Sequence, residues 1–219
     1  MARLYSLVIF DMDGVLADSS IGHALAYAEL WSRLGIAAPP YATLAGRRTV
    51  EVVAEVTRAL APSTEKLDEW VRFKQDQARR HLAQVSSLYP DTLPVLDALD
   101  NAGLSFAVAT GASRMTAELI LAHAGGVSRF RSVVTGDDVT LGKPAPETYL
   151  KVLAATGQPA DAALTVEDSE AGLRSGLDAG TWACSVRTGI TARDDRFVGA
   201  LGDLKGLLRL LGLAASCPG

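Results

Sequence analysis

The sequence has few cysteines, no long apolar run and no excess of basic residues. With two cysteines, Cys184 and Cys217, it lacks a disulfide framework, and we expect one buried thiol and one loose thiol. No apolar run approaches the ~20 residues that a membrane-spanning helix needs. Residues 1–6 lead directly into an apolar run without the charged region and cleavage site of a signal peptide. We therefore expect a cytoplasmic protein that does not bind membranes.

The charge balance and the length of the chain further limit the class of protein to which it can belong. There are 21 Lys and Arg residues against 25 Asp and Glu residues, and the net charge of -4 gives no general attraction to nucleic acid. A chain of 219 residues with 48% hydrophobic residues can bury a sizeable core, either as one domain with a large insertion or as two small domains. No internal repeat or low-complexity segment interrupts it.

The run Leu7-Val8-Ile9-Phe10 leads directly into two acids, Asp11 and Asp13. Such a run is typical of a strand buried on both faces, which delivers Asp11 to the carboxyl end of a parallel sheet. Asp13 shares that edge only if the backbone turns after Asp11, and Gly14 permits the turn at little steric cost. Two negative charges in one crevice require a compensating cation or a shared proton.

A helical segment follows, and strands return only after it. Helical patterns cover 20–34, 43–61 and 63–86, with Pro62 as a break. From residue 91 helices and strands alternate, which predicts right-handed βαβ units and a parallel sheet. The fold class is therefore α/β: a doubly wound, Rossmann-like sheet formed by residues 1–17 and 89–219, with an α-helical cap domain, 18–88, inserted. The tail beyond Leu211 is expected to fray. The expected helices are 91–102, 113–124, 146–156 and 169–179, and the expected strands are 104–109, 132–135, 163–166 and 181–186.

Each later strand is followed by polar groups that suit an anion or a metal. Thr110-Gly111-Ala112-Ser113 offers hydroxyls and backbone N–H groups at a helix start, although Thr and Ser are also ordinary helix caps. Lys143 lies on a loop stiffened by two prolines, which favours a fixed counter-charge over a solvated surface lysine. Glu167 and Asp168 follow another strand. With Asp11 and Asp13 they would form an all-oxygen cluster suited to Mg²⁺ if their strands are neighbours.

These motifs together resemble the haloacid dehalogenase superfamily of aspartyl phosphotransferases, in the phosphatase and β-phosphoglucomutase-like branch with a helical cap after the first motif. The resemblance covers residues 5–190. The four matching segments occur in order, as Asp11-Met12-Asp13-Gly14-Val15-Leu16-Ala17-Asp18-Ser19, Thr110-Gly111, Gly142-Lys143-Pro144-Ala145-Pro146-Glu147-Thr148-Tyr149 and Val166-Glu167-Asp168-Ser169-Glu170-Ala171-Gly172-Leu173.

The resemblance implies a Mg²⁺-dependent phosphatase. Asp11 would attack phosphorus to give an aspartyl-phosphate, and Asp13 would act as general acid and then base, with a pKa above that of Asp11. Thr110 and Lys143 would hold the transferring oxygens. The metal residues would be Asp11, Asp13 through its backbone carbonyl, Asp168, and Glu167 behind them. The expected substrate-binding residues are Met12, Gly111 and Ala112 in the core and His23, Gly46, Arg47 and Arg48 in the cap.

Several alternatives remain open. Asp13 argues against a dehalogenase, and the absence of a lysine after Gly46 argues against a phosphonate hydrolase. A phosphomutase similar to β-phosphoglucomutase shares His23 and Gly46 but has a lysine where this chain has Ala45. A histidine placed like His23 is more often structural, and Arg47 and Arg48 could equally be a solvated helix terminus. A non-catalytic binding protein on the same scaffold is a lesser alternative, because such a protein would be expected to lack Asp11, Asp13 or Lys143.

The expected partner is a small phosphorylated metabolite, such as a sugar phosphate or a phosphoglycolate-like compound, and the expected oligomeric state is a monomer or weak homodimer. The cap would open on hinges near residues 17–18 and 87–89 to admit this substrate.

Overall fold

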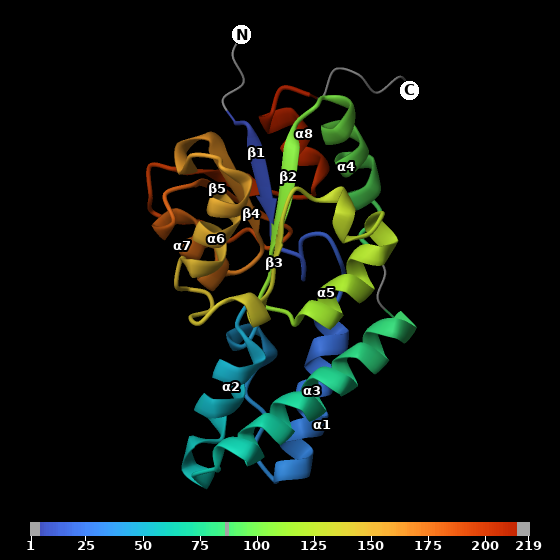
Figure 1. Cartoon of the computed structure of the whole chain (residues 1–219), viewed down its shortest axis with the longest axis vertical. Coiled ribbons are helices and arrows are strands. Elements are labelled where there is room, and N and C mark those ends of the chain that lie inside the picture. The colour runs from blue at the N-terminus through green and yellow to red at the C-terminus, as the bar shows by residue number, and fades with distance from the viewer. Residues whose placement is uncertain (1–4, 86–87, 214–219) are drawn as a thin grey trace.

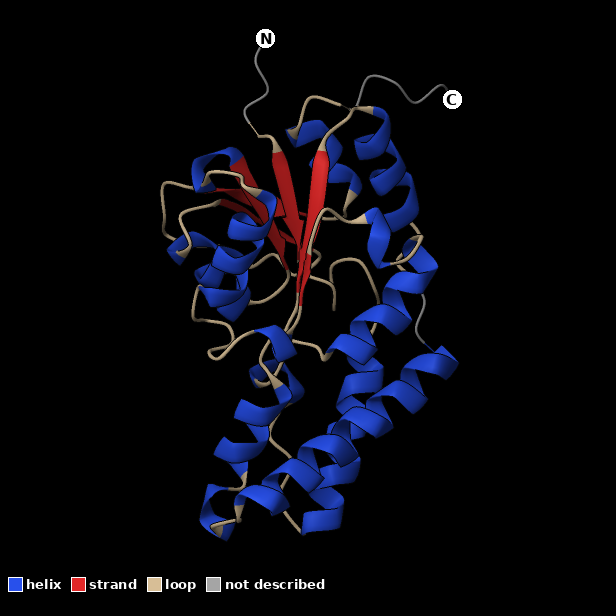
Figure 2. Ribbon diagram, in the orientation of Figure 1, coloured by secondary structure: helices blue, strands red, loops and turns tan. Residues whose placement is uncertain are grey.

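The computed structural model describes residues 5–85 and 88–213 and contains a six-stranded parallel sheet. The strand order is β3-β2-β1-β4-β5-β6, so β1 lies near the middle of the sheet. This is the predicted doubly wound α/β arrangement, with helices on both faces (Figures 1 and 2). The strands are β1 (Leu7–Phe10), β2 (Ser105–Ala109), β3 (Val133–Val134), β4 (Ala163–Glu167), β5 (Trp182–Val186) and β6 (Phe197–Leu201).

Strand β1 is buried on both faces, as its apolar run predicts. Val8 and Phe10 belong to the larger apolar cluster, to which α4, α5 and α8 contribute. Leu7 and Ile9 point to the opposite face, in a cluster with residues of α6. All four side chains are fully buried, since helices cover both faces of the sheet. These covering helices are α4 (Thr92–Asn101), α5 (Arg114–Leu121), α6 (Glu147–Thr156), α7 (Glu170–Asp178) and α8 (Lys205–Leu210).

The register of the central strands brings three chain segments level at the carboxyl edge. Phe10 is paired with Val108 of β2 and with Val166 of β4. The next residue in each chain is therefore Asp11, Ala109 or Glu167, and the Asp11 N–H donates to the Val166 carbonyl at 3.0 Å. After Asp11 the backbone turns, with Gly14 at a φ of 79° as expected for glycine.

Three helices between β1 and β2 lie beyond the carboxyl edge of the sheet (Figure 1). They are α1 (Ser20–Leu34), α2 (Thr49–Val56) and α3 (Thr64–Val85). They share a separate apolar cluster that includes Trp31 and Trp70, both buried. We call α1, α2, α3 and their connections the helical segment.

The structure corrects the element predictions in two places. The helix expected over 43–61 is interrupted: residues 44–46 form a turn, with Gly46 at a φ of 73°, and α2 begins only at Thr49. The last strand and helix, β6 and α8, were not predicted. Strand β6 has a glycine at its centre, which weakens the strand pattern. The fraying expected for the tail falls mostly on 214–219, outside the described residues.

The structure also shows the state of one cysteine and whether a described helix could cross a membrane. Cys184 is a buried free thiol in β5, as predicted, whereas Cys217 lies outside the described residues. Within 5–85 and 88–213, no helix has both the length and the apolar character that crossing a membrane requires.

Candidate active site

Lys143 joins two carboxylates at the carboxyl edge of the sheet. Its Nζ donates to Asp11 Oδ1 and to Glu167 Oε1, each at 2.6 Å, and to the Ala109 carbonyl at 2.9 Å. Tyr149 also donates to Glu167 Oε1, at 2.5 Å. The lysine is only 1% exposed, so the stiff loop holds a buried counter-charge rather than a surface one. Residues more than 130 positions apart in the chain thus meet in one cluster.

The same edge holds an acidic cluster of the kind that binds a hard cation. Ligand oxygens of Asp11, Glu167 and Asp168 all lie within 4.8 Å of one another. Asp11 Oδ2 is buried and has no hydrogen-bond partner within the described residues. A side chain at Gly14 would place its Cβ 1.9 Å from Asp168 Oδ2, so only glycine leaves that carboxylate its position. Three acids facing one lysine fit a site for Mg²⁺, which prefers oxygen ligands.

The pKa values reflect this crowding of negative charge. Burial raises the pKa of Asp11 well above its ordinary value, and Glu167 and Asp168 add to the shift although Lys143 opposes it. Burial, together with Glu167, raises the pKa of Asp168 to about 7. Burial alone would lower the pKa of Lys143, but its two carboxylate partners raise it. A divalent cation among the acids would favour their ionised forms.

Asp13 faces the helical segment instead of the acidic cluster. Its Oδ1 accepts a hydrogen bond from Ser19 Oγ and lies 3.4 Å from His23 Nε2. Burial raises the pKa of Asp13, but the contacts with His23 and Ser19 outweigh it and lower the pKa. The sequence-based expectation was a pKa above that of Asp11. The contacts among the described residues give the reverse order, since Asp13 has favourable partners, whereas Asp11 is fully buried and has acidic neighbours.

Sequence reasoning missed Lys74, a residue of α3 that is 3% exposed. Its Nζ lies 2.9 Å from His23 Nδ1 and 4.2 Å from the centre of the Tyr27 ring. Burial lowers its pKa to about 7, although Asp13 opposes the shift. The sequence did contain a signal that Lys74 is buried. Residues four positions apart lie on one side of a helix, and Lys74 falls in such a series with three apolar residues. That series consists of Trp70, Lys74, Ala78 and Leu82.

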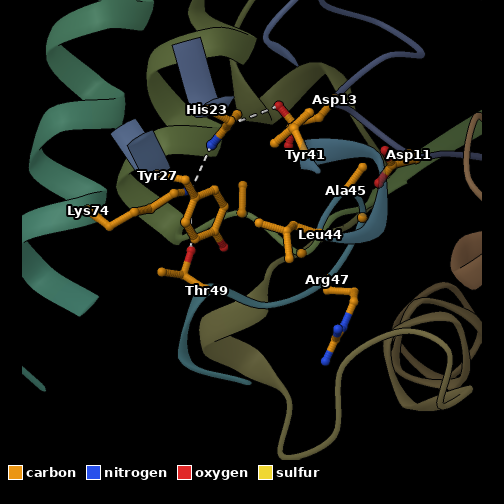
Figure 3. A pocket seen from close by; sticks show the side chains of 13 residues that line it. Asp11, Asp13, His23, Tyr27, Tyr41, Leu44, Ala45, Arg47, Thr49 and Lys74 are labelled. Atoms are coloured by element: carbon orange, nitrogen blue, oxygen red, sulfur yellow. Dashed lines mark hydrogen bonds and ion pairs between the residues drawn. The ribbon is translucent and has the colours of Figure 1, made fainter. Parts of the chain in front are cut away.

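Figure 3 shows the pocket between the sheet edge and the helical segment, with His23 between Asp13 and Lys74. Its volume of about 30 Å³ corresponds to roughly one water molecule. The wall includes five of the predicted residues that bind substrate, together with both catalytic acids. The lining residues are Asp11, Asp13, His23, Tyr27, Tyr41, Leu44, Ala45, Gly46, Arg47, Thr49, Lys74, Gly111 and Ala112.

Two other predicted substrate-binding residues are not part of that lining. The Met12 side chain packs in the core beneath the sheet edge. The Arg48 guanidinium points to the core loop after β3, where Nε donates to the Gly136 carbonyl at 2.8 Å and Nη1 donates to the Thr140 carbonyl at 2.6 Å.

The segment after β2 contains both a helix cap and a close backbone approach. Ser113 caps α5 by accepting from the Thr116 N–H, which is the capping interpretation of this serine. Thr110 is fully buried, and its Oγ1 accepts from the Ala112 N–H at 3.0 Å. A Cβ at Gly111 would lie 2.8 Å from the Gly46 carbonyl oxygen, so glycine allows the helical segment to approach this loop.

Comparisons with known proteins place the chain among hydrolases. The sequence profile described as haloacid dehalogenase-like hydrolase matches residues 8–186. The chain is 30% identical over 195 residues to the N-acetylmuramic acid 6-phosphate phosphatase of Pseudomonas aeruginosa, with 86% of this chain and 84% of that protein covered. It is 29% identical over 192 residues to the fructose-1-phosphate phosphatase YqaB of Escherichia coli, with 85% and 99% covered.

A solved structure shares the architecture. CbbY from Rhodobacter sphaeroides, in complex with xylulose-(1,5)bisphosphate, superimposes with a TM-score of 0.77 and is 25% identical in sequence. The match covers 93% of this chain and 99% of that one, so it includes the helical segment as well as the sheet.

Proposed function

This chain belongs to the haloacid dehalogenase-like hydrolase family, and we propose that it is a Mg²⁺-dependent phosphatase that acts on a small sugar phosphate through an aspartyl-phosphate on Asp11. The observation that carries the proposal is the contact of Lys143 with Asp11 and Glu167, beside Asp168. A nucleophile, a fixed positive charge and a set of cation ligands are the parts that phosphoryl transfer needs.

In this proposal Asp11 Oδ2 is the attacking atom. Lys143 holds Oδ1, whereas Oδ2 has no partner within the described residues. The oxygen forms a bond to phosphorus as the bond from phosphorus to the leaving alcohol breaks. Water then attacks the same phosphorus and releases phosphate, which regenerates the Asp11 carboxylate. Lys143, the Thr110 hydroxyl and the Gly111 N–H would bind the transferring oxygens; Thr110 Oγ1 accepts the Ala112 N–H, which leaves its own hydrogen free to donate.

Asp11, Asp168 and the Asp13 backbone carbonyl would hold Mg²⁺. Glu167, which binds Lys143 and Tyr149, would support the site from behind. When bound, the ion neutralises negative charge on the phosphate and on the acids.

Asp13 would give a proton to the leaving alcohol and then take one from the attacking water. It lies on the cap-facing side of the pocket, next to His23. The contacts with His23 and Ser19 lower the pKa of Asp13. A phosphate dianion in the pocket would raise that pKa through its negative charge, which favours the protonated form needed for the first step.

The helical segment would serve as a cap, residues 18–88, on a core of residues 1–17 and 89–219. A pocket of about 30 Å³ has no room for a sugar, so substrate entry requires the helices to move away from the sheet edge. The two crossing points lie side by side: Ala17 and Leu88 form an antiparallel bridge, and the Tyr89 N–H donates to the Leu16 carbonyl at 3.1 Å. These positions suit paired hinges; Ser87, named in the expected hinge, lies outside the described residues.

The substrate class rests on the relatives and on the pocket wall. Two similar phosphatases are named for sugar phosphates. The wall of the pocket offers hydroxyl groups of Tyr27, Tyr41 and Thr49 and the guanidinium of Arg47, which are suited to a polyhydroxylated leaving group.

A phosphomutase similar to β-phosphoglucomutase is the second candidate, because His23, which the resembling mutases share, lies 3.4 Å from Asp13 at the pocket. Ala45 argues against it, since the resembling mutases have a lysine at this place.

The test is a screen of phosphomonoesters for phosphate release, with and without Mg²⁺, that includes fructose 1-phosphate, N-acetylmuramic acid 6-phosphate and both anomers of glucose 1-phosphate. Release of inorganic phosphate that is lost with a chelator supports the phosphatase. Conversion of a 1-phosphate to a 6-phosphate without release would replace it with the mutase. Full activity in chelator would overturn the metal assignment.

A further inference from the structure

The start of α2 contacts the core loop that leads to Lys143. From α2, Glu51 Oε1 accepts the Gly142 N–H at 2.7 Å. Just before α2, Arg48 donates to the Gly136 and Thr140 carbonyls. Arg48 Nη1 also lies 3.4 Å from Glu51 Oε1, so the two side chains support each other. The helical segment therefore binds both ends of the loop 136–142 with one arginine and one glutamate.

This contact is closely packed. A Cβ at Gly142 would lie 2.5 Å from Arg48 Cγ and 2.9 Å from Glu51 Oε2, so only glycine fits beneath these side chains. The side chains of Arg48 and Glu51 are 17% and 29% exposed. By contrast, Glu55, one turn further along α2, is 56% exposed and pairs with Arg47 of the same helical segment.

The loop has a second support, which comes from the core itself. Glu147 at the start of α6 accepts the Thr140 N–H at 3.0 Å and the Leu141 N–H at 2.7 Å. The next N–H, that of Gly142, has Glu51 as its acceptor. When the helical segment moves away, Thr140 and Leu141 keep their partner, but the Gly142 N–H loses its own. Gly142 directly precedes Lys143.

We propose that Arg48 and Glu51 are positioning residues: they form a clasp that fixes Gly142, and with it Lys143, only when the helical segment is closed on the core. The inference rests on the proposed function for its kinetic consequence. It assigns Arg48 a role other than binding the anionic end of a substrate. Closure then completes the site, because the ammonium that holds Asp11 is placed by a loop that the helical segment itself anchors.

The first test measures amide hydrogen exchange at residues 139–143 in the full chain and requires no catalysis. Glu51→Ala should speed exchange of the Gly142 amide by up to about tenfold, the value of one hydrogen bond. Glu51→Gln should stay near the wild type, since its amide oxygen still accepts the bond. Arg48→Met keeps the packed stem and loses both carbonyl contacts, so it should also speed exchange in this loop.

Two exposed residues of the helical segment provide matched controls. Glu65 and Arg58 contact no residue of the core in any described interaction, so Glu65→Ala and Arg58→Ala should leave the exchange of this loop unchanged. The proposal would be overturned by equal rates of amide exchange in Glu51→Ala and Glu65→Ala. It would also be overturned if Glu51→Gln sped the exchange of the Gly142 amide as much as Glu51→Ala does. If Glu51→Ala does not fold, Arg48→Met and Glu51→Gln decide the question alone.

The second test uses p-nitrophenyl phosphate and separates kcat from KM. Glu51→Ala should lower kcat by up to about tenfold with little change in KM, and Glu51→Gln should restore it. A rise in KM at constant kcat would instead make these residues substrate ligands and overturn the clasp. Should the wild type hydrolyse no phosphomonoester, the proposed function fails, and the exchange measurement still decides whether the clasp exists.

Discussion

Lys143 in the core and Lys74 in the helical segment are both buried lysines of the candidate site, and their partners make them differ. Lys143 contacts two carboxylates directly, and these raise its pKa against the effect of burial. Lys74 contacts a histidine nitrogen and an aromatic ring, and burial lowers its pKa to about 7. Burial disfavours an ammonium in both places, but only at the sheet edge do neighbouring carboxylates compensate for it.

Removing the carboxylate that Lys143 holds should have the largest effect. In Asp11→Asn the attacking oxygen is replaced by an amide, and we expect a loss of phosphate release on the order of 10⁶-fold, by analogy with removal of other nucleophiles. The fold should survive, because asparagine has the same shape. Phosphate release and circular dichroism check both points, and substantial remaining turnover would mean that Asp11 is not the nucleophile.

Removing the positive charge should affect both activity and stability. Lys143→Met leaves the acids at the sheet edge without their cationic partner, which costs about 3–5 kcal/mol in unfolding free energy when a buried pair is broken. Activity should fall on the order of 10²–10³-fold, as for loss of one oxyanion donor. Urea unfolding and phosphate release measure the two effects.

Lys66→Met is the matched control for Lys143→Met, since Lys66 is 52% exposed and pairs with Glu69 within α3. It should change the unfolding free energy by less than about 1 kcal/mol. Similar losses in the two variants would contradict the difference between a buried ion pair and an exposed one.

Asp13→Asn tests the acid on the side of the helical segment. It should slow hydrolysis of sugar phosphates about 10²–10⁴-fold, because their alkoxide leaving groups need a proton. Hydrolysis of p-nitrophenyl phosphate, whose leaving group needs none, should fall much less. Steady-state rates on both substrates decide the matter, and equal losses would exclude Asp13 as the general acid.

Lys74→Met should have the smallest effect on turnover and a distinct effect on stability. Folding lowers the pKa of Lys74 from 10.5 to about 7, so between these pH values the unfolded chain binds a proton that the folded protein does not. The contribution of Lys74 to the unfolding free energy therefore rises with pH across this window. The variant should lose this rise, which urea unfolding at several pH values will measure; parallel curves for wild type and variant would contradict the lowered pKa.

The sequence predicted the meeting of Asp11 with Glu167 because both lie at or just beyond strand ends of a parallel sheet, whereas Lys143, on the loop before α6, was expected there from its stiff loop and from the resemblance. Parallel strands that are joined by helices end at one edge, whatever the details of packing. The order of the pKa values of Asp11 and Asp13 was not predictable in this way. It depends on His23 and Ser19 near Asp13, and these contacts form only when the helical segment folds against the sheet edge.

Arg48 shows a similar limit. The sequence predicted a substrate-binding residue, but its guanidinium donates to the Gly136 and Thr140 carbonyls. Carbonyl acceptors leave no mark on the local sequence, because every residue has one. The elements β6 and α8 were not predicted for a similar reason, because they depend on contacts with distant parts of the chain. The short strand β6, with Gly199 at its centre, forms because β5 offers it an edge to pair with.

By itself, the sequence determined the parallel sheet, the helical segment between β1 and β2, and the acids at the strand ends, because apolar periodicity and strand-end residues are local properties. Only the tertiary structure decided that Lys74 lies buried beside His23, that Arg48 and Glu51 face the loop before Lys143, and that the pocket has a volume of about 30 Å³. These features depend on how two separately patterned regions pack against each other, and desolvation and hydrogen-bond geometry at that contact are set by distance, not by sequence spacing.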